Sequence, residues 1–78
     1  MTNLEKITKV FADTFGTNEN EVATLQYQGI EEWDSVGHMT LIAALEDEFG
    51  IEMDTDDIID MSSFEKAKEI LAKYNIEL

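Results

Sequence analysis

The amino-acid sequence predicts an all-α protein, a small four-helix bundle with a long first loop and a short third helix. Apolar residues recur at helical spacing in several segments, and glycines or capping residues mark the ends of those segments. No alternation of apolar and polar residues lasts long enough to predict a strand. The 78 residues leave room for a single domain, residues 1–78, with one modest core.

The first helix is predicted to begin after Thr2 and to end before Gly16. Thr2 and Glu5 have the spacing of a capping box, in which each side chain accepts a hydrogen bond from the other residue's backbone. Glycine is common just past a helix end. The apolar residues that would face the core are three or four positions apart: Leu4, Ile7, Phe11 and Phe15.

The segment 17–34 is long for a connection inside a compact domain. Loops longer than about 12–15 residues usually have a function or contain secondary structure of their own. We expect this loop to be anchored across the helices by its apolar residues: Val22, Leu25, Tyr27, Ile30 and Trp33.

The second helix is predicted to run from Ser35 to Phe49. Asp34 is the expected N-cap, because its carboxylate can accept hydrogen bonds from the free amides of the first turn. Gly50 then ends the helix.

A short third helix is predicted between Gly50 and Ser62, with Asp54 as its N-cap. In this arrangement Ile58 and Ile59 face the core, and the acidic side chains of the helix face solvent: Asp56, Asp57 and Asp60.

The last helix is predicted to begin at Ser62, which would form a capping box with Glu65. Glu69 and Lys73 are four residues apart and should pair on its outer side. Its buried stripe would consist of five residues: Phe64, Ala67, Ile70, Leu71 and Tyr74.

The chain is strongly acidic, with 18 Asp and Glu, five Lys and no Arg, and a formal net charge of −13. From Val10 to Glu65 there are 15 acidic residues and no basic one. Such a surface repels phosphate backbones and anionic lipid heads, so we expect neither nucleic acid nor a membrane as a partner. It should attract proteins that carry basic patches. The alternative is that the acidity serves solubility alone.

Cysteine is absent, which fits a reducing compartment, and the N-terminal residues contain no continuous apolar stretch. Neither a signal peptide nor a membrane span is predicted. We expect a cytoplasmic monomer.

Asp34, Ser35 and His38 are the residue types of a catalytic triad, and a helix would place Ser35 and His38 on one face. The geometry argues against catalysis, because Asp34 is better placed to cap amides than to orient His38. The sequence also lacks a G-x-S-x-G motif. We therefore expect His38 to be an exposed helix residue and the protein not to be an enzyme.

Ser35 is also a candidate attachment point. A helix N-terminus leaves backbone N–H groups free and carries partial positive charge, so it accommodates a phosphate well. The spacing alone does not distinguish an attachment point from an ordinary helix start.

The acidic segment 54–65 partly matches the twelve-residue calcium loop of an EF-hand. However, Ile58 occupies the central ligand position and Ile59 replaces the glycine of the turn. Such a loop should not close around the ion, so we predict no metal site and interpret these acids as a solvated surface. Weak binding of divalent ions that relieves repulsion between the acids stays open.

The segment DSVGHMTLIAALEDEFGIEM, residues 34–53, resembles the centre of acyl carrier proteins. In that family an Asp-Ser-Leu triplet opens the second helix and an ALEEEF-type segment closes it. Here Asp34-Ser35-Val36 and residues 44–49 occupy those places. The resemblance covers nearly the whole chain, because the length, the acidity, the long first loop and the segment MSSFEKAKEIL also match.

The resemblance implies that Ser35 carries a 4′-phosphopantetheine arm, which a separate phosphopantetheinyl transferase transfers from coenzyme A. The arm ends in a thiol that holds acyl groups as thioesters. Chemistry would then occur in acyl-loading and acyl-transferring enzymes, whose basic patches would dock on the second helix. The expected contact residues are two apolar and five acidic ones: Val36, Met39, Asp34, Glu46, Asp47, Asp56 and Asp57. Core packing is the alternative for Met39.

Some residues depart from the pattern of fatty-acid carriers. Gly37 and Thr40 stand where acidic residues are frequent, and Trp33 stands where a smaller residue is usual. A glycine inside a helix costs about 1 kcal/mol relative to alanine. We interpret Gly37 as room for a partner's backbone, which predicts that Gly37→Ala stabilises the helix but slows modification.

The run from Trp33 to His38 looks more like stand-alone carriers of specialised pathways than the primary fatty-acid carrier. A D-alanyl, aminoacyl or peptidyl carrier with the same arm is the nearest alternative. The alternative from a different class is an unmodified acidic module that binds a basic protein.

Overall fold

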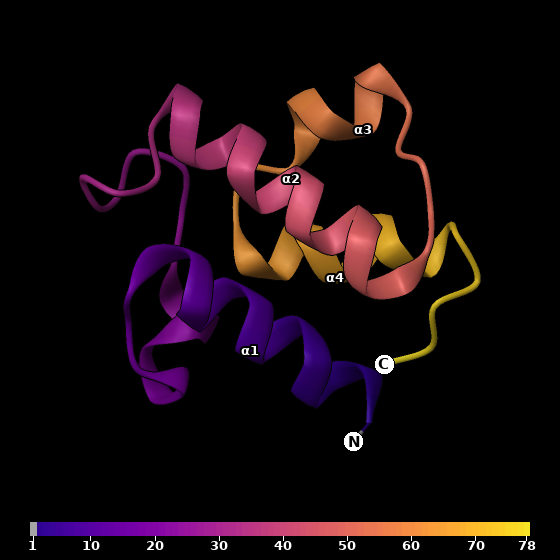
Figure 1. The fold of residues 1–78 in the computed structure, drawn as a ribbon, viewed down its shortest axis with the longest axis horizontal. Helices are drawn as coiled ribbons and strands as arrows, with labels where there is room; N and C mark the ends of the chain where they lie inside the picture. Colours follow the sequence, from indigo (N-terminus) through magenta and orange to yellow (C-terminus); the bar gives the residue numbers. More distant parts are fainter. Residues whose placement is uncertain (1) are drawn as a thin grey trace.

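The computed structural model describes residues 2–78, and in this range the chain is all-helical, as the sequence predicts (Figure 1). Helices α1, α2 and α4 form the body of the bundle, and the short α3 lies beside α2. A 3-10 helix, η1, lies inside the long first loop. The elements are α1 (Asn3–Phe15), η1 (Glu19–Thr24), α2 (Ser35–Phe49), α3 (Thr55–Asp60) and α4 (Phe64–Ala72).

Both ends of α1 and α2 form as the sequence predicts. At the start of α1, Thr2 and Glu5 form the complete capping box. The Asp34 carboxylate caps α2 by accepting a hydrogen bond from the Gly37 N–H at 2.8 Å. Gly16 and Gly50 end the two helices with φ values of 65° and 63°, a left-handed conformation that favours glycine.

The start of α4 differs from the prediction. Ser63 is the N-cap and accepts a hydrogen bond from the Lys66 N–H, so the predicted role of Ser62 in a capping box is wrong. The cause is a contact with the long loop. The Tyr27 N–H donates to the Ser62 carbonyl at 2.8 Å, and an isolated antiparallel bridge follows between Gln26 and Ser63. This pairing keeps the chain extended through Ser63 and delays the helix by one residue.

The predicted orientation of α3 is partly wrong. Ile58 packs against the core as expected, but Ile59 is 73% exposed and Asp57 is only 4% exposed. The Asp57 carboxylate turns inward because it accepts hydrogen bonds from Lys73 and from the Tyr74 hydroxyl. These partners satisfy a carboxylate that would otherwise be costly to bury.

Lys73 is therefore not available on the outer side of α4. The predicted Glu69–Lys73 pair is absent, because Lys73 lies just past the end of the helix and pairs with Asp57. Glu69 lies near Lys66 instead, at 3.8 Å. The predicted buried stripe is confirmed for four residues, while Tyr74 is half-buried.

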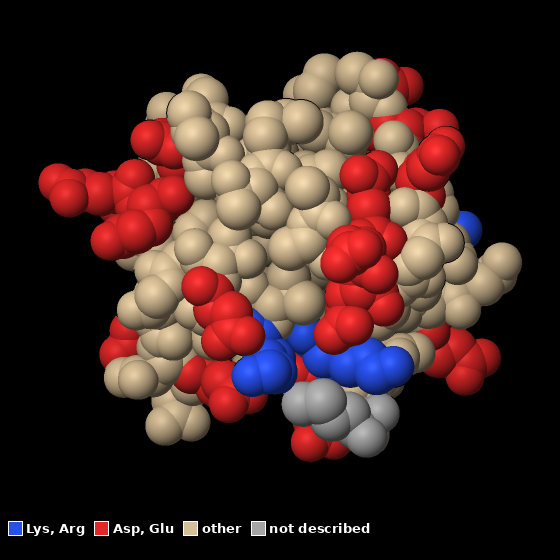
Figure 2. Space-filling view, in the orientation of Figure 1, with Lys and Arg blue, Asp and Glu red and all other residues tan. Residues whose placement is uncertain are grey.

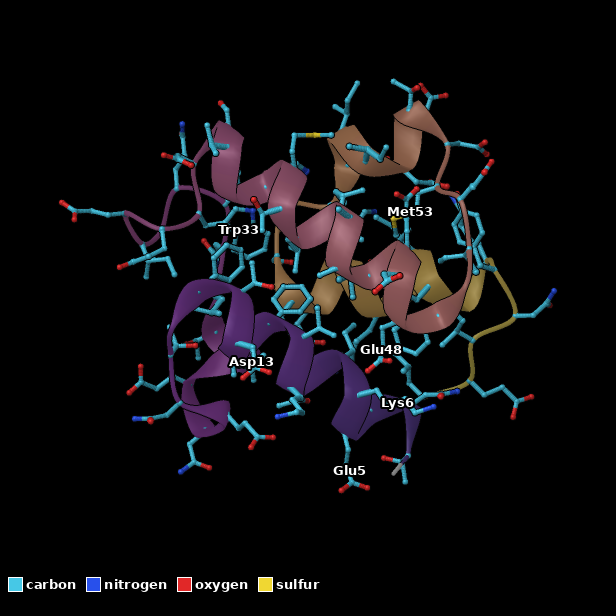
Figure 3. All side chains as sticks on the ribbon, in the orientation of Figure 1. Glu5, Lys6, Asp13, Trp33, Glu48 and Met53 are labelled. Atoms are coloured by element: carbon cyan, nitrogen blue, oxygen red, sulfur yellow. The ribbon has the colours of Figure 1, made fainter. Side chains whose placement is uncertain are left out.

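Trp33 anchors the long loop in the core. Its side chain is fully buried, stacks on Phe15 with the ring centroids 5.0 Å apart, and meets Phe11 edge-on (Figure 3). Val22 and Leu25 are buried as well, which confirms the predicted anchoring, whereas Tyr27 lies at the surface. Between residues 2 and 78, none of the helices combines the length and the apolar character that a membrane crossing needs.

Candidate functional site

Ser35 is the first residue of α2 and is exposed. Its hydroxyl lies 3.3 Å from the hydroxyl of Tyr27, which comes from the long loop. The Asp34 carboxylate is occupied by the Gly37 amide, so it caps the helix and does not orient a catalytic base. The structure therefore gives Asp34 and Ser35 the positions that the sequence predicts for a capped helix start.

Gly37 has a structural reason within the chain itself. A Cβ atom at this position would lie 1.9 Å from the carbonyl oxygen of Glu32, which no side chain tolerates. The loop that carries Glu32 thus packs directly on the first turn of α2. The interpretation of Gly37 as space for a partner's backbone is not needed, and this contact predicts that Gly37→Ala loses stability instead of gaining it.

His38 links three elements and is half-buried, so its predicted exposure is wrong. Its Nδ1 accepts a hydrogen bond from the Trp33 Nε1–H at 2.9 Å. Because an indole nitrogen only donates, Nδ1 carries no proton, and Nε2–H donates to the Ile58 carbonyl at 2.6 Å. His38 thereby connects the long loop, α2 and α3. Since both ring nitrogens are engaged and neither partner is Ser35, the arrangement is not a catalytic relay.

A groove of about 390 Å³ opens beside Ser35, between the first turns of α2 and the chain around α3. Its lining is mostly apolar, and it includes Tyr27, Ser35, His38, Met39, Ile59 and Met61. A larger hollow of about 740 Å³ lies between the start of α1 and the C-terminal residues, and none of the residues around Ser35 lines it. Proximity to the candidate serine makes the smaller groove the relevant one.

The predicted contact residues fall into two groups. Val36 and Met39 are 76% and 55% exposed, so core packing does not explain Met39. Asp47 and Asp56 are also exposed. Figure 2 shows acidic side chains toward both ends of α2, with an uncharged surface between them and lysines along the lower edge.

Two predicted acidic contacts are engaged within the fold. The Glu46 carboxylate is half-buried and accepts a hydrogen bond at 2.9 Å from the backbone N–H of Met53, the residue labelled in Figure 3. Asp57 is buried, as described above. Its expected role as an acidic contact on the surface is wrong, because its carboxylate faces Lys73 and Tyr74 instead of solvent.

Hydrogen bonds around Asp57 shift three pKa values. Those from Lys73 and Tyr74 lower the pKa of Asp57, although burial opposes this. The bond to Asp57 raises the pKa of Lys73 and also that of Tyr74. The Tyr74 hydroxyl in turn accepts a hydrogen bond from the Asp54 N–H at 2.9 Å. These shifts favour a charged Asp57 carboxylate, a charged Lys73 and a neutral Tyr74. In these states the ion pair of Asp57 and Lys73 holds α3 against the end of α4.

Sequence reasoning missed Tyr27 and the bonding of His38 as parts of this site. The spacing of Ser35 and His38 predicts a shared helix face. No local pattern shows that Tyr27 returns to Ser35, because the fold of the intervening loop brings them together.

The family model described as a phosphopantetheine attachment site matches residues 5–71 of the chain. The matched range contains Ser35 and every helix that surrounds the groove. No curated protein shows a significant match to the chain. The family match agrees with the resemblance noted in the sequence, and domains of this family are the site of covalent attachment of 4′-phosphopantetheine. The chain therefore belongs to the phosphopantetheine-attachment family of carrier domains.

Proposed function

We propose that this protein is an acyl carrier protein in which Ser35 bears the 4′-phosphopantetheine arm. The observation that supports Ser35 best is its exposed hydroxyl at the start of α2, at the mouth of the apolar groove. The chain contains only two other serines, Ser62 and Ser63. Ser63 is committed to capping α4, and Ser62 lies outside any helix.

The attachment step would transfer the phosphopantetheine arm from coenzyme A to Ser35. In the attachment step, Ser35 Oγ would form a bond to the phosphorus nearest the pantetheine of coenzyme A. The bond from that phosphorus to the adenosine bisphosphate would break, and the hydroxyl proton would pass to a base of the transferase. When bound, the arm supplies a thiol that holds acyl groups as thioesters. The chain itself has no cysteine, so the reactive thiol would come entirely from the arm.

We propose that partner enzymes, including the transferase, dock on the exposed face of α2 and α3. Val36 and Met39 would supply apolar contacts, and Asp34, Asp47 and Asp56 would attract basic patches. The absence of basic residues between Val10 and Glu65 supports this division of the surface. Glu46 is half-buried and bonded to Met53, so it would add negative charge to the docking face but make little direct contact with a partner enzyme.

The group carried by the arm is the second part of the proposed function. We favour an acyl group of a specialised pathway, because of the residues from Trp33 to His38. An aminoacyl, D-alanyl or peptidyl carrier would use the same serine and the same arm. The protein would act as a carrier without catalytic activity of its own.

Incubation with coenzyme A and a phosphopantetheinyl transferase of broad specificity tests the proposal. The intact mass should rise by one phosphopantetheinyl group in the wild type and in Ser62→Ala, but not in Ser35→Ala. If the wild type gains no mass while a known carrier is fully modified in the same tube, the protein is instead an unmodified acidic binding module.

A further inference from the structure

Tyr27 is held firmly beside Ser35 and still presents its hydroxyl to the surface. Its backbone N–H donates to the Ser62 carbonyl, which fixes the residue against the start of α4. Its ring packs edge-on against Trp33 and His38, with centroids 6.5 and 5.5 Å away. Tyr27 is 36% exposed, and its hydroxyl lies 3.3 Å from Ser35 Oγ. The packing therefore leaves the phenol hydroxyl free to bond at the attachment point.

The hydrogen-bond roles of the two hydroxyls change when Ser35 is modified. Before modification, either hydroxyl can donate to the other. After modification, Ser35 Oγ is an ester oxygen without a proton, so only Tyr27 can donate. The neighbouring phosphodiester carries a negative charge, and a hydrogen bond to a charged acceptor is roughly twice as strong as a neutral one.

Other side-chain donors near Ser35 are scarce. No lysine or arginine occurs between Val10 and Glu65. The Nε2–H of His38 is used by the Ile58 carbonyl, and the Gly37 amide is used by Asp34. Among residues 2–78, Tyr27 is the one side chain whose hydrogen bond reaches Ser35 Oγ. The phenol is thus a side-chain donor that can add to the backbone N–H groups of the α2 N-terminus in compensating an anion on Ser35.

We propose that Tyr27 is a cofactor-positioning residue, whose hydroxyl donates a hydrogen bond to the phosphodiester on Ser35. This inference rests on the proposed attachment at Ser35. The bond holds the first part of the arm at the mouth of the groove and restricts its rotation about the serine.

Phosphorus-31 NMR of the modified protein tests the proposal directly. The wild type, Tyr27→Phe and Ser62→Ala would each be loaded with phosphopantetheine. Tyr27→Phe keeps the ring that packs on Trp33 and His38 but removes the donor. Ser62→Ala removes a different hydroxyl from the same groove. Tyr27→Phe should shift and narrow the phosphodiester resonance, whereas Ser62→Ala should leave it unchanged.

A second measurement needs no variant. The chain has two tyrosines, so labelling with 13Cζ-tyrosine gives two resonances. Attachment of the arm should move the Tyr27 resonance and leave that of Tyr74, which is bonded to Asp57, in place. An unmoved Tyr27 resonance, or a phosphodiester resonance that is identical in the wild type and Tyr27→Phe, overturns the role of Tyr27 but not the attachment. Failure of the wild type to accept the arm overturns both.

Discussion

The carbonyl oxygen of Glu32 lies against Gly37, so close that a Cβ on Gly37 would be 1.9 Å from it. The last turn of the long loop therefore rests on the first turn of α2, directly beside the candidate attachment serine. A glycine inside a helix is unfavourable by about 1 kcal/mol relative to alanine. Glycine is nevertheless needed at this position, because a Cβ atom would collide with the backbone of Glu32.

Gly37→Ala should destabilise the protein, although alanine is the better helix former. The new methyl group must displace the backbone of Glu32, and such overpacking typically costs about 1–3 kcal/mol. Urea unfolding would measure the loss. The matched control is Ala43→Gly at an exposed position of α2, which should cost about 1 kcal/mol from helix propensity alone. A Gly37→Ala protein more stable than the wild type would rule out the contact with Glu32.

His38→Phe should also lower the free energy of unfolding. The substitution keeps an aromatic ring but leaves the Nε1–H of the fully buried Trp33 without its acceptor. An unsatisfied buried donor costs about 1–3 kcal/mol. Chemical unfolding followed by fluorescence of the single tryptophan would report the change. Unchanged stability in His38→Phe would show that the bond between Trp33 and His38 is not important for the fold.

Asp57 should contribute stability that depends on pH. Its pKa lies below the ordinary value of 3.8 because Lys73 and Tyr74 donate hydrogen bonds to its carboxylate. A lowered pKa in the folded state stabilises the protein at neutral pH, and this contribution disappears as the pH falls through the folded pKa. At high pH the same pair weakens when Lys73, whose pKa is raised above 10.5, loses its proton.

Asp57→Asn should accordingly be less stable than the wild type at pH 7, and the difference should shrink below about pH 4. Asp56→Asn, an exposed change on the same helix, is the control for the loss of one negative charge. Urea unfolding at a series of pH values measures both. Parallel pH profiles for the wild type and Asp57→Asn would exclude the proposed ion pair.

Reversal of exposed acidic charges should slow docking of the transferase. The double variant Asp47→Lys and Asp56→Lys would weaken electrostatic steering, which accelerates association about 10-fold or more at low salt. Asp13→Lys on α1, an exposed acidic residue outside the proposed docking face of α2 and α3, serves as the control. Initial modification rates should fall strongly in the double variant at low salt and converge with those of the wild type at high salt. Equal rates at low salt would remove these acids from the docking surface.

The bounds of α1 and α2 could be predicted because their signals are local. Capping residues lie within three positions of the amides they bind, and glycines mark both C-terminal ends. The same locality made Asp34 and Ser35 identifiable as a capped helix start. The general fold follows from the helical spacing of apolar residues.

Most of the wrong predictions concern contacts between residues far apart in the sequence, although the contact of Gly37 with Glu32 spans only five residues. The acidic run around α3 predicts Asp57 at the surface, but its partner Lys73 lies at the far end of the next helix. The sequence predicts an exposed His38, but the Ile58 carbonyl that it bonds belongs to another element. The later start of α4 depends on pairing with the long loop. Helical periodicity contains no information about such partners, so only the assembled structure reveals them.

Fragment mass spectrometry of the modified protein identifies the residue that carries the arm and so tests the attachment at Ser35. The protein would be modified with coenzyme A and a phosphopantetheinyl transferase, digested, and fragmented. We predict one phosphopantetheinyl group on the peptide that contains Ser35, with the fragment masses assigning the group to this serine alone. Modification of Ser62 or Ser63, or no modification while a control carrier is fully loaded, would contradict it.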